Sequence, residues 1–252
     1  MTKSRAFYVE ELLQRGRTTP VSGEGLRQMS RKKITILGLG SLLSERSART
    51  TFPELTGFRL AMVSGYRRSF SHPAAIFFKR NIADLEKKRF CSLSAEECDG
   101  ASFVCTAFEV DDVGMDAFRE REEEYRLEMV KFSVPGHGIP EDGQAMVGLL
   151  CCRTTDDEYI LRWGKERFER DYVACGVPTI WGWQPDSSVE PCHAYLRHCV
   201  LAAQKLGDLC LSSFLDQTFL VDRKTTIRTY LEHHPEVMET LPPAELAERY
   251  GG

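Results

Sequence analysis

The 252-residue sequence lacks several features that would place it in a broad class of proteins at once. No run of about 18 apolar residues occurs, so we expect no membrane-spanning helix and no membrane partner. Positive charge is not in excess, because 33 Lys and Arg stand against 37 Asp and Glu, for a net charge of −4. We therefore expect no nucleic-acid partner. With 42% hydrophobic and 28% charged residues and no internal repeat, the composition is typical of globular proteins.

The Cys-x-x-Cys pattern is also missing, although the chain contains nine cysteines. Their odd number, together with the lack of an apolar secretory segment in the first residues, predicts reduced thiols and a cytoplasmic location. Cys192-His193 and His198-Cys199 suggest zinc, but the second ligand pair of a structural zinc site is missing. We therefore expect no metal site and no cofactor.

Hydrophobic periodicity divides the chain into a β-rich part followed by a helical part. A first strand is predicted to begin at Ile34, with further β-rich runs at 59–70, 74–80, 102–110, 127–134 and 145–153. One helix is predicted over 111–126, and the chain is mainly helical from Asp156 onward. Because strands and helices do not alternate strictly, the pattern favours an α+β fold over a doubly wound sheet.

Three parts of the chain differ in charge and predicted structure. Residues 1–33 contain eight Lys and Arg against three acids, which predicts a basic N-terminal arm. A core is expected over 34–215. Residues 216–252 are expected to form a helical C-terminal extension of that core.

A glycine-containing loop, Gly38-Leu39-Gly40-Ser41-Leu42, follows the first predicted strand. A dinucleotide-binding fingerprint is disfavoured, because Leu43 stands where the third glycine belongs. The same Leu43 argues against a Gly-x-Ser-x-Gly nucleophile at Ser41. Two interpretations stay open: a plain strand-to-loop turn, or a loop whose backbone N–H groups bind a carboxylate or oxyanion.

The predicted helix over 111–126 is rich in acids, most of which suit a solvated face with arginine partners. Met115, Phe118, Glu122 and Tyr125 follow the spacing of one helical face, whereas Glu120 points the other way. Because Met115 and Phe118 must face the core, Glu122 is expected to point inward. An inward carboxyl group on an apolar face is typical of proton-transfer sites, although a structural ion pair is an equally open interpretation.

Three segments in sequence order resemble the γ-glutamylcyclotransferase-like superfamily. The loop Gly38–Leu42 resembles its YGS-L loop, and FRLAMVSGYRRSF resembles the segment that follows, with Gly57, Arg59, Leu60, Gly65, Arg67 and Phe70 at the pattern positions. FREREEEYRLEMV resembles its catalytic element, an Arg-Glu followed by a Tyr and then a strand. This sequence departs from the pattern in two ways: the loop tyrosine is Leu39, and both Arg119-Glu120 and Arg121-Glu122 precede Tyr125.

The resemblance implies a mixed β-barrel or sheet with surrounding helices, and an enzyme that works without metal or nucleotide. Such enzymes convert a γ-glutamyl amide to 5-oxoproline and release the amine or amino acid. Glu122 would then be the general acid and base. The substrate-binding residues would be Gly38, Leu39, Gly40, Ser41, Leu42 and Tyr125. Arg67 is a further candidate, because its guanidinium could bind a substrate carboxylate through two hydrogen bonds.

Two other functions remain open at this stage. Leu39 in place of the tyrosine, and the long helical C-terminal part, favour a binding or scaffold protein that keeps the fold without the chemistry. A nucleotide-binding oxidoreductase rests only on the Gly-Leu-Gly of the loop. Four kinds of substrate stay open from the sequence. Three are small molecules, namely γ-glutamyl amino acids, glutathione and γ-glutamyl amines, and the fourth is a γ-glutamyl group carried by a protein.

Overall fold

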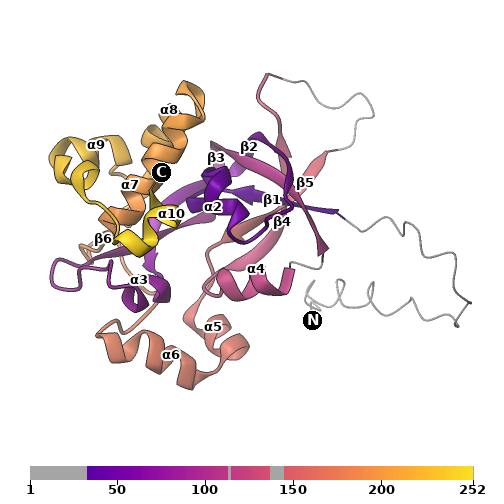
Figure 1. Cartoon of the computed structure of the whole chain (residues 1–252). Coiled ribbons are helices and arrows are strands. Elements are labelled where there is room, and N and C mark those ends of the chain that lie inside the picture. Colours follow the sequence, from indigo (N-terminus) through magenta and orange to yellow (C-terminus); the bar gives the residue numbers. More distant parts are fainter. Residues whose placement is uncertain (1–32, 113–114, 137–144, 252) are drawn as a thin grey trace, which may run out of the picture. The chain divides into compact units, whose positions relative to one another are not determined.

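The computed structural model describes residues 33–112, 115–136 and 145–251 (Figure 1). By its internal contacts the chain divides into two units, Met1–Arg31 and Lys32–Gly252, and only the second contains described residues. Of the predicted basic arm over 1–33, all but Lys33 therefore lies outside the described residues.

Seven strands form one mixed sheet in the order β6-β3-β1-β5-β4-β2-β7. The strands are β1 (Lys33–Gly38), β2 (Thr56–Pro73), β3 (Arg89–Asp111), β4 (Arg126–Ser133), β5 (Met146–Cys152), β6 (Glu190–Pro191) and β7 (Thr218–Leu220). Because β2 pairs with β3 as well as with β4, five strands close into a barrel. Within it β1 runs parallel to β5, whereas β1–β3, β2–β3, β2–β4 and β4–β5 are antiparallel.

Helices surround the barrel and make up most of the C-terminal part of the described chain (Figure 1). They are η1 (Ser41–Leu43), α2 (Glu45–Arg49), α3 (Ala75–Lys79), α4 (Met115–Arg121), α5 (Asp156–Trp163), α6 (Lys165–Asp171), η3 (Val173–Cys175), α7 (His193–Lys205), α8 (Asp208–Asp216), α9 (Ile227–His233), η4 (Pro235–Glu239), η5 (Ala244–Leu246) and α10 (Ala247–Tyr250). The predicted α+β class, a mixed barrel with surrounding helices, is confirmed.

The long strand β2 follows the curvature of the barrel because it is interrupted by bulges. One register shift against β3 lies between Ser64 and Tyr66, at Gly65, whose φ is +81°. Glycine adopts this left-handed conformation without the steric cost that a Cβ atom adds. Bulges of this kind bend a strand and increase its twist, which a closed barrel requires.

Most predicted elements are confirmed, and three differ from the prediction. The β-rich run at 74–80 is the helix α3, so that prediction was wrong; burial of Ala75 and Phe77 against the core overrides the strand preference of the run. The helix predicted over 111–126 is shorter, since α4 ends at Arg121 and residues 122–125 form a turn that leads into β4. Gly164, at φ +90°, divides the predicted long helix after Asp156 into α5 and α6.

Of residues 216–252, those that the structure describes, 216–251, pack on the rest of the described unit. Strand β7 pairs with β2 through Arg68, Ser69 and Phe70. The last helix, α10, contacts both α2 and α7 (Figure 1). The C-terminal residues thus reach the start of the barrel, next to the loop that follows β1.

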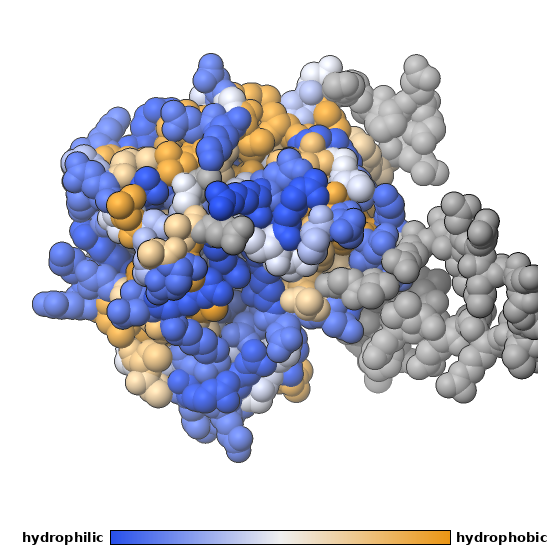
Figure 2. All heavy atoms as spheres, in the orientation of Figure 1, coloured by the Kyte–Doolittle hydropathy of each residue, from blue (hydrophilic) through white to orange (hydrophobic). Residues whose placement is uncertain are grey.

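On the face shown in Figure 2, hydrophilic residues are interspersed with hydrophobic ones. The exposed large hydrophobic residues among those described include Leu161 on α5, Met129 on β4 and Leu241. Among the described residues, no helix combines the length and the apolar character that crossing a bilayer requires.

Candidate functional site

The glycine loop lies at the end of β1 and is held by contacts within the protein. The Thr106 hydroxyl donates to the carbonyl oxygens of Gly38, at 3.3 Å, and of Leu42, at 2.9 Å. A Cβ atom on Gly38 would lie 2.5 Å from the Thr106 hydroxyl oxygen, and one on Gly40 would lie 2.2 Å from the hydroxyl oxygen of Tyr195. Both glycines are therefore required by close approaches of this chain's own side chains.

Glu122 lies immediately after α4, in the turn that connects this helix to β4. Met115 and Phe118 bury one face of α4, and the Glu122 N–H donates to the Phe118 carbonyl oxygen at 2.9 Å. The Tyr125 N–H in turn donates to the Glu122 carbonyl oxygen at 3.1 Å. This turn directs Glu122 and Tyr125 inward, whereas Glu120, on the last turn of α4, is exposed.

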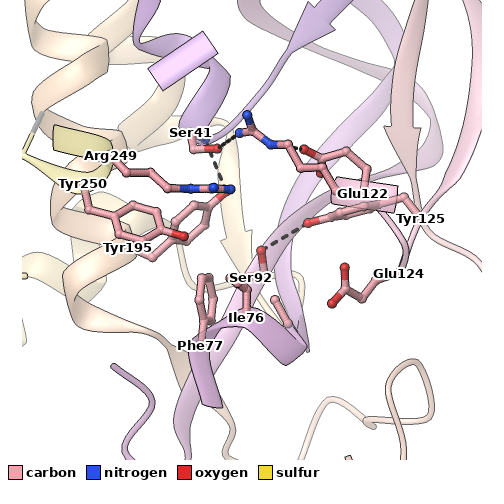
Figure 3. A pocket seen from close by; sticks show the side chains of 12 residues that line it. Ser41, Ile76, Phe77, Ser92, Glu122, Glu124, Tyr125, Tyr195, Arg249 and Tyr250 are labelled. Atoms are coloured by element: carbon pink, nitrogen blue, oxygen red, sulfur yellow. Dashed lines mark hydrogen bonds and ion pairs between the residues drawn. The ribbon is translucent and has the colours of Figure 1, made fainter. Parts of the chain in front are cut away.

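Glu122, Tyr125, Ser41 and Tyr195 line two adjoining hollows. The loop hollow, of about 270 Å³ including its open mouth, is lined mainly by apolar residues: Leu37, Leu39, Gly40, Ser41, Leu42, Leu93, Glu122, Tyr125, Cys151 and Tyr195. The polar hollow, of about 340 Å³ on the same measure, is lined by Ser41, Ala74, Ile76, Phe77, Ser92, Arg121, Glu122, Glu124, Tyr125, Tyr195, Arg249 and Tyr250 (Figure 3). Segments of the chain more than 200 residues apart thus meet at one site.

Arg121 connects Glu122 to the loop. Its Nε lies 2.8 Å from Oε1 of Glu122, and its Nη2 donates to the Ser41 hydroxyl at 3.0 Å, while Nη1 contacts the Thr51 hydroxyl. The side chains of Arg121 and Glu122 are only 9% and 13% exposed, so the pair is shielded from solvent. The arginine therefore fixes the position of the Glu122 carboxylate relative to Ser41.

Two tyrosine hydroxyl groups provide neutral hydrogen-bonding groups next to Glu122. Tyr125 donates to the Leu93 carbonyl oxygen at 3.1 Å and lies 3.1 Å from the Ser92 hydroxyl. The hydroxyl of Tyr195, on α7, accepts from the Ser41 N–H at 3.3 Å. Burial raises the pKa of both phenols well above the usual value, so they stay protonated near neutral pH.

Glu124 is a second carboxyl group in the polar hollow. Its Oε1 accepts from the Ala75 N–H at 2.9 Å and from the Tyr172 hydroxyl at 2.7 Å. Burial, and next the negative charge of Glu123, raise the pKa of Glu124 to about 7. At neutral pH this group is therefore close to half protonated.

Glu123 and Glu124 were expected on a solvated helix face, and both are buried. That expectation was wrong because it extended the helical phase beyond Arg121, where α4 ends. Glu123 instead forms an ion pair with Arg167 on α6.

Of the predicted site residues, six meet at the two hollows: Leu39, Gly40, Ser41, Leu42, Glu122 and Tyr125. Gly38 lies beneath them, packed against Thr106 and Leu42. Arg67 does not line either hollow; its Nε lies 2.7 Å from Oε1 of Glu96, which Arg223 also contacts at 3.1 Å. Arg67 is thus engaged in an ion pair on the sheet and is not among the residues that line the two hollows.

The sequence pattern gave no catalytic or substrate-binding role to Tyr195, Arg249 or Tyr250. Tyr195 belongs to the segment PCHAYLRHCV, which was predicted as a helix, but only the folded chain shows that its hydroxyl reaches Ser41. Arg249 and Tyr250 lie in the C-terminal part, which no motif connected to the loop. Their place depends on long-range packing of α10 against α7.

Among the described residues, no three His, Cys, Asp or Glu side chains come together as a set of metal ligands. All nine cysteines fall in described segments and are free thiols. Burial lowers the pKa of His198, on α7, to about 4, and its ring Nε2 lies 3.4 Å from the Ser41 carbonyl oxygen. This histidine is therefore neutral and structural at neutral pH.

Comparison with known proteins gives matches at the level of structure only. No protein-family model matches the sequence, and no curated protein matches it. A γ-glutamyl cyclotransferase structure is 11% identical, with a TM-score of 0.37 over 49% of this chain and 68% of that chain. The glutathione-specific γ-glutamyl cyclotransferase from yeast is 12% identical, with a TM-score of 0.42 over 82% of this chain and 96% of that chain.

A human protein described as uncharacterised is 10% identical, with a TM-score of 0.43 over 84% of this chain and 90% of that chain. Identities of 10–12% and TM-scores below 0.5 do not assign this chain to a family, an activity or a substrate.

Proposed function

We propose that this protein is a γ-glutamyl cyclotransferase, a metal-independent lyase that converts a γ-glutamyl amide to 5-oxoproline and releases the amine or amino acid. One observation carries the proposal: Glu122 and Tyr125 line the loop hollow together with Leu39, Gly40, Ser41 and Leu42, about 80 residues earlier in the chain. The resemblance of the sequence to the γ-glutamylcyclotransferase-like superfamily implies a site made of the same six residues. Nine free thiols suit a cytoplasmic location, where the enzyme would act on a small-molecule substrate.

The reaction needs one proton-transfer group at the position of Glu122. The substrate's α-amine attacks its own γ-carbonyl carbon; a new C–N bond forms, and the original amide C–N bond breaks. The amine starts as an ammonium with a pKa of about 7.7–8.0. Glu122 carries two protons in turn from the attacking nitrogen to the leaving nitrogen: one from the ammonium before the attack, and one from the attacking nitrogen once the new C–N bond has formed. The lactam nitrogen keeps one hydrogen, the released amine ends as an ammonium, and the carboxylate is restored at the end of each cycle.

The surrounding groups have complementary tasks in this proposal. Arg121 orients the Glu122 carboxylate. The protonated Tyr195 hydroxyl, which accepts from the Ser41 N–H, lines the same hollow and would donate to the carbonyl oxygen as negative charge develops on it. The Tyr125 hydroxyl, which donates to the Leu93 carbonyl oxygen, lines the site beside Glu122. The curled conformation of the glutamyl chain brings the amine to the carbonyl carbon, so the enzyme contributes mainly by positioning the reacting groups.

The test is 5-oxoproline release from a panel of γ-glutamyl amino acids, γ-glutamyl amines and glutathione. We expect Glu122→Gln to lower kcat/KM by roughly 100-fold or more, because it removes the proton-transfer group. Glu120→Gln is the matched control, since this exposed acid is two residues away, and its activity should stay within about twofold of wild type. Loss of activity in Glu120→Gln with retention in Glu122→Gln would contradict the assignment.

The ion pair between Arg121 and Glu122 favours a second candidate, a binding protein that retains the fold without the chemistry. In that case the carboxylate serves as a contact that joins the turn after α4 to the loop. Wild-type protein that binds a γ-glutamyl compound but releases no 5-oxoproline from any member of the panel would establish this alternative.

A further inference from the structure

Arg249, in the C-terminal helix α10, extends into the polar hollow that contains Ser41, Glu122 and Tyr195 (Figure 3). Its position is set by the neighbouring Tyr250, which is 2% exposed. The Tyr250 ring packs edge-on against Tyr195, with centroids 6.2 Å apart, and against His198, at 5.6 Å. Both partners lie on α7, so the helix that carries the Tyr195 hydroxyl also anchors the segment that carries Arg249.

The Arg249 guanidinium lacks an anionic partner within the described part of the chain. No ion pair joins it to a described acid within 4 Å, and its buried Nε has no hydrogen-bond partner there. Its charged group lies 5.7 Å from the centroid of the Tyr250 ring. Burial lowers the pKa of Arg249, and the positive charges of Arg121 and Arg80 act in the same direction, whereas Tyr250 and the negative charge of Glu122 act in the opposite direction.

One of the two arginines that line the polar hollow forms no ion pair with a described acid. Arg121 is already paired with Glu122 at 2.8 Å, and Glu124 accepts hydrogen bonds from Ala75 and Tyr172. Arg249 therefore contributes a half-buried cation without a counterion of its own among the described residues. A guanidinium in such a place is stabilised by a carboxylate ligand, which it binds through two parallel hydrogen bonds.

We propose that Arg249 is a substrate-binding residue that holds the α-carboxylate of the γ-glutamyl group. This inference rests on the proposed function, in which Glu122 receives a proton from the α-amine. The α-amine and the α-carboxylate are bonded to the same carbon atom. When the amine contacts Glu122, the carboxylate therefore lies close to Arg249, which lines the same hollow. The polar hollow thus binds the amino-acid head, and the substrates are γ-glutamyl compounds with a free α-carboxylate.

The first experiment compares γ-glutamylethylamide with its α-carboxamide analogue, which lacks the negative charge. For Arg249→Gln we expect KM for γ-glutamylethylamide to rise by about 10- to 100-fold with little change in kcat, as for loss of a charged hydrogen bond. Wild type should strongly prefer the carboxylate over the carboxamide, and Arg249→Gln should lose that preference. Retention of the preference in Arg249→Gln would overturn the inference.

Two controls separate direct binding from other effects. Arg80→Gln removes a positive charge that also acts on Tyr250 but does not line the hollow, and it should leave KM within about twofold. γ-Glutamylglycine has a second carboxylate on its leaving group. Equal effects of Arg249→Gln on γ-glutamylglycine and γ-glutamylethylamide are expected, whereas an effect on γ-glutamylglycine alone would assign Arg249 to the leaving group and contradict the inference.

Calorimetry with L-glutamine separates this inference from the proposed function, because L-glutamine has the same amino-acid head and a γ-amide. Binding by wild type that is lost in Arg249→Gln supports the carboxylate site even if no 5-oxoproline is released, in which case only the proposed function fails. Equal binding by both proteins, or no binding by wild type, overturns the inference. Unchanged thermal unfolding of Arg249→Gln would show that the variant is folded.

Discussion

At the scale of single residues, the polar hollow holds two carboxyl groups in different surroundings. Glu122 lies against a guanidinium, whereas Glu124 lies among Ala75, Tyr172 and the negative charge of Glu123. Burial makes ionisation of Glu124 unfavourable, and its pKa of about 7 lies well above the usual 4.5. Glu124 is therefore a carboxyl group whose protonation changes near neutral pH.

Glu124 also makes the stability of the protein depend on pH. Because its pKa is higher in the folded than in the unfolded state, the unfolded state loses the proton first as pH rises, and stability falls between about pH 4.5 and 7. Between pH 5 and 8 the wild type should lose about 2–3 kcal/mol more free energy of unfolding than Glu124→Gln, which keeps an acceptor oxygen but does not ionise. Urea unfolding at the two pH values measures this, with Glu120→Gln as the exposed control; equal losses in wild type and Glu124→Gln would refute it.

At the scale of elements, the site depends on contact between the loop after β1 and helix α7. Gly40 allows the Tyr195 hydroxyl to approach the loop, where it accepts from the Ser41 N–H. His198, one helical turn further along α7, lies near the Ser41 carbonyl oxygen. The loop and the helix therefore form one structural unit, although more than 150 residues separate them.

This contact predicts the effect of adding one methyl group. Gly40→Ala should destabilise the protein by about 1–3 kcal/mol, because its Cβ would lie 2.2 Å from the Tyr195 oxygen. Adding Tyr195→Phe removes that oxygen and should recover most of the loss, since the next ring atom lies at 3.4 Å. Chemical unfolding of the two single variants and the double variant forms a complete cycle. Simple additivity of the two single effects would show that the contact is not the cause.

Local sequence patterns select the site residues whose positions depend on neighbours in the sequence. They miss those whose positions depend on contacts with residues far away in the sequence. Met115 and Phe118 fix the inward side of α4, and the loop glycines mark the end of β1, so Glu122 and the loop were predictable from neighbouring residues. Glu124 was missed because the helix ends three residues before it. Tyr195 and Arg249 were missed because their positions depend on packing of α7 and α10 against a loop far away in the sequence.

At the scale of the whole molecule, the C-terminal helices are joined to the barrel through buried polar contacts. Arg68 on β2 is fully buried and donates at 2.9 Å to the carbonyl oxygens of Val104, on β3, and Ser213, on α8. Its guanidinium lies 4.8 Å from the Phe103 ring centroid and 5.1 Å from that of Phe214. Burial lowers its pKa to about 10, so the side chain stays charged at neutral pH.

Replacement of Arg68 should therefore weaken the attachment of α8 to the sheet. Arg68→Met leaves two buried carbonyl oxygens without this donor and should cost about 2–4 kcal/mol of unfolding free energy. The adjacent Arg67→Met is the matched control, because it removes only the partly exposed contact to Glu96 and should cost about 1 kcal/mol or less. Equal costs in denaturant unfolding would contradict the role given to Arg68.

The class of fold follows from the order of strands and helices along the chain, but closure of the barrel does not. Closure depends on β2 pairing with both β3 and β4, and on a bend at Gly65 that hydrophobic alternation does not reveal. The first half of β3, from Arg89 to Ala101, was not predicted, because its polar stretch around Glu96–Asp99 interrupts the apolar pattern. Pairing with β2 holds that stretch in the sheet.

The central claim, cyclisation with Glu122 as the proton-transfer group, is tested most directly by identifying the product formed in ¹⁸O-labelled water. The account predicts that wild type releases unlabelled 5-oxoproline and amine in equal amounts, and that Glu122→Gln releases both at least about 100-fold more slowly. Water takes no part in cyclisation, so no label enters the product. Labelled glutamate in place of 5-oxoproline, or undiminished 5-oxoproline release by Glu122→Gln, would contradict the account.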